Sequence, residues 1–191
     1  MTYSQGNELD SLHKVVQTNG SSLELVKAHI ALAEMYSDTA PDIALEHGMK
    51  AHDLCSEGQH EGLLYEALQA MNLAFYMLGD YESLLKYSFR SLKLAESKGE
   101  AEMICNDHNW IASANIELGY TETAIEHSIK ALQIAITSRD SLLIAYCTMD
   151  MEAGYRVLGD YEKGMQYCQD ALKLFVALKN VNGESFALQQ I

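Results

Sequence analysis

The sequence predicts an all-α protein built as a stack of helix pairs, and two observations support that prediction. The first is an internal repeat: segment 78–82 (LGDYE) returns forty residues later as 118–122 (LGYTE) and again as 158–162 (LGDYE). Repeats of roughly 20 to 50 residues are typical of stacked arrays, in which each unit buries its apolar face against its neighbours. The second is composition, since 48% of the 191 residues are hydrophobic and only one is proline. Long helices can therefore run without a break.

One helix is predicted before the repeats, within residues 1–20. Four apolar side chains in residues 8–18 fall on one helical stripe, and Asn19-Gly20 supplies a stop. The next helix is predicted to start after Ser21, because Ser21 and Glu24 have the spacing of a capping box. In that motif the hydroxyl and the carboxylate each bind an amide that the first helical turn leaves without a partner.

Four helix pairs are predicted next, together covering residues 21–180. Their bounds are about 21–58, 61–98, 101–138 and 141–179. In the first pair Pro41 opens the second helix, where its fixed φ suits the first helical position. The later pairs turn at Gly79, Gly119 and Gly159, and Asp80 is the predicted N-cap after the first of these turns. An acid follows every turn, namely Asp42, Glu82, Glu122 and Glu162. Such an acid faces the positive end of the helix dipole and stabilises it by about 0.3 to 1 kcal/mol.

Residues 181–191 are predicted to begin a fifth unit. Asn182-Gly183 is interpreted as the break before it, and the helix that starts at Glu184 stops well short of the length of its predecessors. Terminal repeats usually present a polar outer face, whereas this end carries Phe186, Leu188 and Ile191. We therefore expect the N-terminal module of a longer protein, and the alternative is a homodimer formed through this exposed C-terminal end.

The turns within the pairs resemble those of the tetratricopeptide repeat, in the extended form of about forty residues found in bacterial signalling and regulatory proteins. Gly79-Asp80-Tyr81 and Gly159-Asp160-Tyr161 match the turn of the family, and Gly119-Tyr120-Thr121 matches it less closely. The small residues of its second helix correspond to Ala44, Ala51, Ala124, Ala131 and Ala171. The first-helix glycine of the family is absent. The usual proline at the end of the second helix is replaced by Ser56, Glu96, Ile136 and Val176, so the helix can continue.

The resemblance extends over about residues 22–180 and implies a right-handed α-α superhelix, the tetratricopeptide-repeat solenoid, with four helix pairs. In this family the first helices of the pairs line a concave groove that holds a peptide or a partner helix. The groove positions so implied are His29, Tyr36, Glu66, Gln69, Leu73, Tyr76, Asn109, Ser113, Glu117, Tyr146, Met149 and Arg156, with Ala33 and Ala153 between them. For Leu73 and Met149 the alternative is packing between adjacent units.

One subset of the family binds the C-terminal carboxylates of chaperones through Lys and Asn side chains in the groove. The matching positions here are His29, Ala33, Ala70, Tyr146 and Asp150. These residues do not supply the charge-assisted donors that a carboxylate needs. The sequence therefore argues against a chaperone adaptor.

No arrangement typical of an active site or a metal site is found in the sequence. His47 and His52 are five residues apart and do not share a helix face, and there is no HExxH motif or glycine-rich phosphate loop. The four cysteines form no CxxC pair and fall within helical periodicity. We therefore expect reduced cysteines in a cytoplasmic protein, and no metal, no cofactor and no enzymatic activity.

The charge balance restricts the partners. There are 27 acidic against 13 basic residues, which gives a formal net charge of -14. Such a field repels nucleic acid and anionic membranes, and no apolar run is long enough to span a bilayer. The expected partner is a protein or a peptide, and the acidic field favours a basic one.

The sequence thus predicts a non-catalytic scaffold that binds a partner segment in a groove. The alternative is a sensory or regulatory input domain of a bacterial signalling protein. Its output domain, beyond residue 191, would be a diguanylate cyclase, a histidine kinase or a transcriptional regulator.

Overall fold

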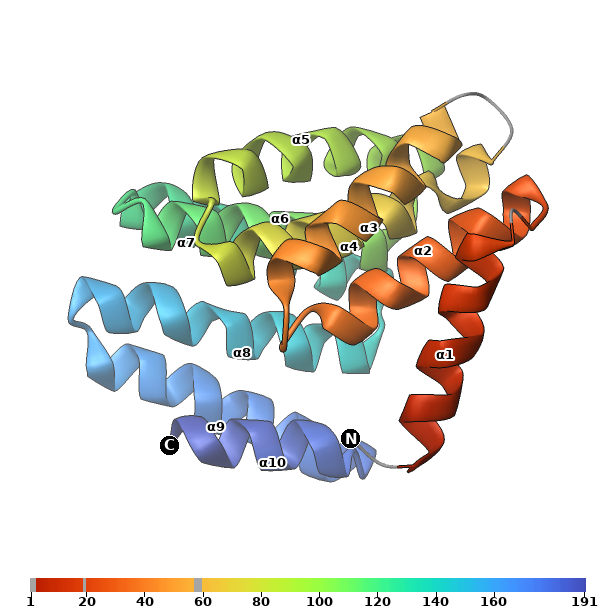
Figure 1. The fold of residues 1–191 in the computed structure, drawn as a ribbon. Helices are drawn as coiled ribbons and strands as arrows, with labels where there is room; N and C mark the ends of the chain where they lie inside the picture. The colour runs from red at the N-terminus through yellow and green to blue at the C-terminus, as the bar shows by residue number, and fades with distance from the viewer. Residues whose placement is uncertain (1–2, 19, 57–59) are drawn as a thin grey trace. The chain divides into compact units, whose positions relative to one another are not determined.

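The computed structural model describes residues 3–18, 20–56 and 60–191, and these residues form helices joined by short turns (Figure 1). In chain order the α-helices are α1 Tyr3–Gln17, α2 Ser22–Tyr36, α3 Pro41–Leu54, α4 Leu64–Leu78, α5 Tyr81–Lys98, α6 Ala101–Glu117, α7 Thr121–Ser138, α8 Ser141–Leu158, α9 Tyr161–Leu178 and α10 Val181–Gln190, with the short 3-10 helix η2 at Glu61–Leu63. No strand occurs in these described segments. The predicted all-α fold is confirmed.

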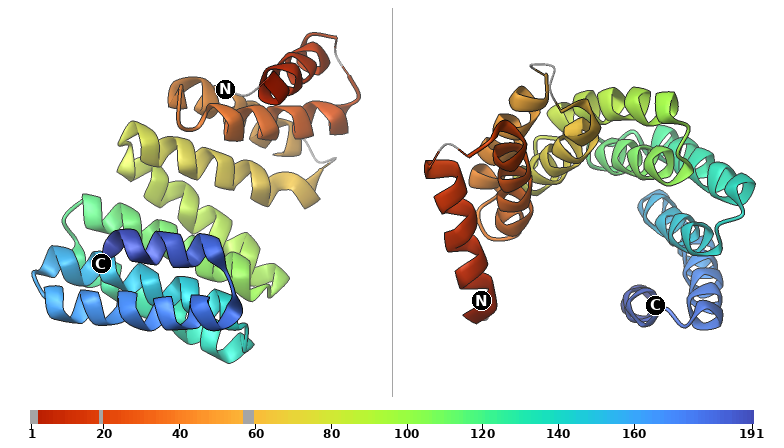
Figure 2. Two further views of the ribbon diagram at one scale, coloured as in Figure 1. Left: turned by 90° about the horizontal axis from the view of Figure 1, so that it is seen from below. Right: turned by 90° about the vertical axis from the view of Figure 1, so that its right-hand side faces the viewer.

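The chain divides into two compact units, Met1–Ser91 and Leu92–Ile191, and α5 contains the point of division. In the first unit α2 packs against α1, α3 and α4, and α3 also packs against α4. In the second unit α6 pairs with α7 and α8 pairs with α9, while α7 contacts α8 and α9 contacts α10. Within each unit consecutive helices lie side by side, as Figure 2 shows. Helices thus pack mainly against their neighbours in sequence, as the repeat predicts.

The helix starts follow the predicted capping chemistry. The backbone N–H of Ser21 donates to Glu24 Oε2 at 2.9 Å, and the Glu24 N–H donates to Ser21 Oγ at 3.4 Å. Pro41 is the first residue of α3. Asp80 Oδ1 accepts from the Ser83 N–H at 3.1 Å, which confirms Asp80 as the N-cap of α5.

The turns between paired helices require left-handed backbone at their glycines. Gly79, Gly119 and Gly159 have φ of 72°, 83° and 84°, a region that other residues enter at a cost. Between successive pairs the left-handed position falls on Gly99, but its counterparts forty and eighty residues later are Arg139 and Lys179, with φ of 61° and 56°. Within the described residues the same turn therefore occurs three times, once with glycine and twice without it.

Helix boundaries differ from the prediction at three places. The first helix begins at Tyr3 rather than at residue 8, and a 3-10 turn over Glu61–Leu63 precedes α4. The predicted break at 182–183 is wrong, because α10 begins at Val181 and the Gly183 N–H donates to Asn180 Oδ1 at 2.7 Å. Asn19 and the predicted end of the first pair at 58 lie outside the described residues.

Gly183 has a packing role instead of a turn role. An added Cβ at this position would lie 2.3 Å from Phe175 Cδ1, and Phe175 is fully buried. Only glycine lets α10 approach the Phe175 ring of α9 this closely. The glycine that suggested a break in the sequence therefore allows close helix contact.

Small residues let the second helices pack closely. Ala44, Ala51, Ala124, Ala131 and Ala171 are all fully buried, as expected from their small size and repeat position. The four cysteines are free and buried. By contrast, Phe186, Leu188 and Ile191 at the C-terminal end are 47%, 60% and 50% exposed. Among the described helices, none combines the length and apolar character that a membrane span requires.

Candidate functional site

In the first unit, the predicted groove residues of α4 share one helix face. Glu66 is exposed, while Gln69, Leu73 and Tyr76 are half-buried. This spacing of three to four residues places them in one row along the helix. The Tyr76 ring meets the Tyr81 ring edge to face, with centroids 6.1 Å apart. The α4 face therefore offers one acid, one amide and mixed apolar surface.

The α2 residues lie in a different register from the one that the sequence predicted. The pattern of buried residues in α2 returns in α4 after 39 residues rather than 40. His29 therefore corresponds to buried Leu68 and not to Gln69. The cause is the turn between α2 and α3, which spans residues 37–40 where the later turns are shorter. His29 is only 6% exposed and Ala33 only 1%, so both are packed inside the helix pair. Tyr36 is half-buried, and its hydroxyl lies 2.9 Å from His13 Nε2.

In the second unit, the predicted residues lie on neighbouring helices α6 and α8. Asn109 and Ser113 are half-buried, and Glu117 is exposed on α6. On α8, Tyr146 and Arg156 are exposed, and the Arg156 Nε–H donates to Glu152 Oε1 at 3.0 Å.

Met149 differs from the other predicted residues of α8. It is 4% exposed and packs with Phe175 of α9 and Ala187 of α10. Its side chain therefore contributes to the core, the alternative that the sequence left open for it.

A polar contact joins α6 to α8. The Asn109 amide Nδ2 donates to Asp150 Oδ2 at 2.5 Å. Burial raises the pKa of the Asp150 carboxyl from 3.8 to about 7. The Oδ1 atom of Asn109 is buried and accepts no hydrogen bond from any described residue. Asp150 is not among the predicted groove residues. The sequence does contain a clue, because a carboxyl stands at position 150 where the equivalent positions hold the uncharged Ala70 and Trp110.

Two buried pairs of histidines join first to second helices, and sequence reasoning missed both. In histidine pair 1, His29 Nδ1 of α2 lies 2.8 Å from His47 Nδ1 of α3. In histidine pair 2, His108 Nδ1 of α6 lies 2.9 Å from His127 Nδ1 of α7. All four rings are at most 9% exposed. The partners are 18 and 19 residues apart, so a search for ligands on one helix face does not find them.

Comparison with known proteins relates this geometry to one repeat fold. A Rap protein solved in complex with competence and sporulation factor superposes with a TM-score of 0.76 at 17% identity, over 88% of this chain and 48% of that one. The apo form of RapI superposes with a TM-score of 0.73 at 20% identity, over 92% of this chain and 50% of that one. A STAND signal-transduction ATPase from Pyrococcus horikoshii, with a tetratricopeptide repeat sensor, gives 0.72 at 18% identity over 86% of this chain and 26% of that one. This chain has a tetratricopeptide-repeat-like fold.

The sequence comparison is consistent with that fold. Tetratricopeptide repeat protein 29 of Trypanosoma brucei brucei is 23% identical over 158 residues, which cover 82% of this chain and 32% of that protein. No family profile matches the chain. The chain spans about a third of this curated relative and about half of the two Rap structures.

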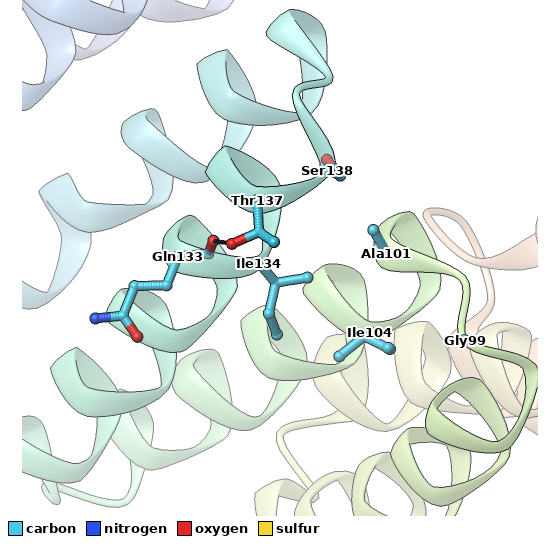
Figure 3. Close-up of a pocket in the computed structure, with 7 residues that line it drawn as sticks. All are labelled: Gly99, Ala101, Ile104, Gln133, Ile134, Thr137 and Ser138. Carbon is cyan, nitrogen blue, oxygen red and sulfur yellow. Dashed lines mark hydrogen bonds between the residues drawn. The ribbon is translucent and has the colours of Figure 1, made fainter.

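A pocket of the tetratricopeptide-repeat-like second unit lies away from the predicted groove residues. It has a volume of about 410 Å³ and lies between the start of α6 and the end of α7 (Figure 3). Its lining consists of Gly99, Ala101, Ile104, Gln133, Ile134, Thr137 and Ser138. None of the predicted groove residues lines it. The pocket offers apolar surface and a few neutral polar groups, but no charged side chain.

In the second unit Cys147 and Cys168 lack the character of nucleophiles, and burial raises the pKa of the Cys168 thiol. The Cys105 thiol donates to the Ala131 carbonyl oxygen at 3.2 Å. A hydrogen bond to Cys105, together with burial, raises the pKa of the Cys147 thiol. A thiol held neutral and away from solvent is a poor nucleophile. Among the described residues, no group of three or more His, Cys, Asp or Glu side chains is placed to hold a metal ion.

Proposed function

We propose that this chain is a non-catalytic interaction module that binds a protein or peptide segment on the first-helix faces of its repeats. The fold supports this proposal, because stacked helix pairs present preorganised surfaces and lose little entropy when a segment binds. One of the structures with this fold is a Rap protein in complex with competence and sporulation factor. The half-buried Gln69, Tyr76 and Ser113 offer amide, phenol and hydroxyl groups for such contacts.

The observation that carries the proposal is the environment of Asp150. Its carboxyl is half-buried and receives one hydrogen bond, from the neutral amide of Asn109. Among the described residues, no Lys or Arg forms an ion pair with it. A cationic group of a ligand would supply the charge-assisted bond that the ionised carboxylate lacks. We infer a basic segment as partner, which the net charge of -14 would also attract.

A peptide library tests this function directly. The purified chain is titrated with a fluorescent positional-scanning library of capped hexapeptides, and binding is followed by anisotropy. We expect enrichment of Arg or Lys at one position. For the enriched peptides, Asp150→Asn should weaken binding by about 10-fold or more, the effect of losing one charge-assisted hydrogen bond. The matched control is Glu162→Gln, which removes the same charge from an exposed position on α9.

The outcomes separate two failures. If no peptide of the library binds, the proposed interaction function is contradicted. If peptides bind without preference for a cation and Asp150→Asn behaves like Glu162→Gln, only the basic character of the partner is contradicted. Asn109→Ala and Tyr76→Ala test the two faces separately, because each lies in a different unit. Each should weaken binding if its own face takes part.

A regulatory input domain is the second candidate function. The observation that favours it is the likeness to the STAND protein with a tetratricopeptide repeat sensor, of which this chain matches 26%. In this case the output would be a diguanylate cyclase, a histidine kinase or a transcriptional regulator in the same polypeptide. The test is to read the native frame around these residues and to measure the encoded output with and without a binding peptide. An output that does not respond would contradict the sensor function while leaving the scaffold function intact.

A further inference from the structure

The two histidine pairs occupy equivalent places in alternate repeats. His47 and His127 are eighty residues apart, and each belongs to the same short pattern, EHGMK at 46–50 and EHSIK at 126–130. At the corresponding places the second helix pair has Leu68 with Tyr87, and the fourth has Thr148 with Tyr167. A histidine pair thus replaces a pair of side chains that does not gain charge in mild acid. The distribution is a property of the repeats and not of one local environment.

The geometry allows one proton between the two facing nitrogens. With Nδ1 atoms 2.8 Å apart in pair 1 and 2.9 Å in pair 2, one ring donates its N–H and the other accepts. When both rings are protonated, both Nδ1 atoms carry hydrogens and neither can accept. Two buried positive charges then lie side by side. The rings must separate to be solvated, and the helices that carry them must separate as well.

The charged groups around each pair act mainly against protonation. Around pair 1, burial and the charge of Lys50 lower the pKa of both rings, and His13 of α1 acts on His47 in the same direction. Glu46 opposes them, but Lys50 Nζ donates to its carboxylate at 2.5 Å. Met71 of α4 packs against Gly48, beside His47, and is neutral.

The second pair also has a Lys and a Glu beside it, and a carboxyl on a neighbouring helix where the first pair has His13. Burial and Lys130 lower the pKa of His108 and His127, and Glu126 opposes this for His127. Ile125 of α7 contacts Gly154 of α8, a neutral contact. Asp150 of α8 bonds Asn109, the neighbour of His108, and takes up a proton in the same pH range. Because a protonated Asp150 strengthens the contact between α6 and α8, it works against the histidines.

We propose that the two buried histidine pairs make the helix pairs α2–α3 and α6–α7 open in mild acid, ahead of the helices that have no such pair. This inference stands independently of the proposed binding function. Repeat arrays allow local opening of this kind, because each unit depends chiefly on its nearest neighbours. The residues predicted for binding on α2 and α6 would change position together with these helices. Acid would therefore remodel those surfaces.

The direction and size of the effect of pH on helix opening follow from proton linkage. The pKa of His29 is lowered to about 4 in the folded chain, so its stabilising effect is complete above about pH 6.5 and is lost as the pH falls towards 4. At pH 5 this histidine alone should raise the equilibrium constant for opening about 30-fold relative to pH 7.5. The same holds for His108, whose pKa is also lowered to about 4.

Hydrogen exchange resolved by helix tests the proposal. Protection factors, corrected for intrinsic exchange rates, are measured at pH 7.5 and pH 5. In the wild-type chain, α2 and α3 should lose about 30-fold or more of their protection. The double variant His29→Leu with His47→Tyr carries the residues of the second helix pair and should abolish this loss. For α6 and α7, protection is measured in the Asp150→Asn variant, because this substitution removes the carboxyl that works against the histidines. The matching double variant for this helix pair is His108→Thr with His127→Tyr.

Side-chain titration by NMR keeps the proposal testable even where a double variant fails to fold. The ring protons of His29, His47, His108 and His127 are followed in the wild-type chain from pH 8 to pH 4. Titration well below the ordinary histidine range, accompanied by broadening of α2 and α3 amides, is the expected result. Titration of all four rings near pH 6.5 without loss of structure would overturn the proposal. So would an equal acid-induced loss of protection in every helix.

Discussion

Asp150 shows how one half-buried carboxyl can be suited to bind a ligand and still lower the stability of the free chain. Its pKa is raised by burial to about 7, so ionisation above that pH is opposed by the folded structure. The Asn109 amide satisfies one carboxylate oxygen only. Residues that are destabilising where they lie, but suited to a ligand, are frequent in functional sites.

Asp150→Asn is therefore expected to stabilise the free chain at pH 8. The unfolded carboxyl ionises near pH 3.8 and the folded one near 7, so stability falls as the pH rises through this window and the substitution removes that loss. The amide introduced by the substitution could also donate to Asn109 Oδ1, which accepts from no described residue. We expect a gain of about 1 to 3 kcal/mol at pH 8 by urea unfolding, and a smaller gain at pH 5. A gain of equal size at both values would show that ionisation is not the cause.

At the residue scale, the sequence predicted which positions are buried or capping better than it predicted which side chains contact one another. The buried alanines and the caps at Ser21 and Asp80 follow from local spacing, which a sequence displays directly. His29 was assigned to a binding face because the longer turn at residues 37–40 shifts the register by one, and this shift shows only in burial. The contact of His29 with His47 depends on how two antiparallel helices align. Spacing along a single helix does not contain that information.

At the scale of the element, the turns between helix pairs contain the clearest local strain. Gly99 adopts φ of 71° without cost, whereas Arg139 and Lys179 occupy the same left-handed region with side chains. Local hydrogen bonds close these turns, since the Arg139 and Lys179 N–H groups donate to the carbonyl oxygens of Ile136 and Val176 in the last turns of α7 and α9. Stability gained elsewhere in the packing supports the strained backbone.

Arg139→Gly and Lys179→Gly should each stabilise the chain modestly. Relief of the left-handed conformation gains about 1 to 2 kcal/mol, and the greater freedom of glycine in the unfolded state returns part of it. A net gain of about 0.5 to 1 kcal/mol is expected from thermal or urea unfolding followed by circular dichroism. The reverse change, Gly99→Ala, should destabilise by a similar amount. If all three variants were neutral, these turns would not be strained in solution.

Glycine at 183 illustrates why element boundaries were harder to predict than elements. Asn-Gly is a common helix stop, and this was the basis for expecting a break at 182–183. In the structure Asn180 begins α10, and Gly183 fits against the Phe175 ring. A small residue can serve a turn or a close contact, and only the neighbouring helix decides between them.

At the scale of the whole molecule, the period of forty residues predicted the helix pairs because every unit repeats the same apolar positions. It could not predict the ligand, since one repeat fold supports many binding functions through side chains that vary from unit to unit. At Asp150 and at the two histidine pairs, this chain carries side chains that adjacent units lack at the same places. The distinctive chemistry of this chain is concentrated at these positions.

Nearest-neighbour packing also predicts that damage to the core stays local. Leu32 of α2 and Phe175 of α9 are both fully buried, one in each compact unit. Leu32→Ala should weaken the helices around it by about 2 to 5 kcal/mol and lower the hydrogen-exchange protection of α1 to α4. Because stability in a repeat array is largely a sum of neighbouring contacts, protection of α8 to α10 should change little. Phe175→Ala is the reciprocal variant, expected to expose α8 to α10 while α1 to α3 keep their protection. A uniform loss across all helices in either variant would mean that the chain unfolds as one cooperative unit, and the acid-induced opening of single helix pairs would then be excluded as well.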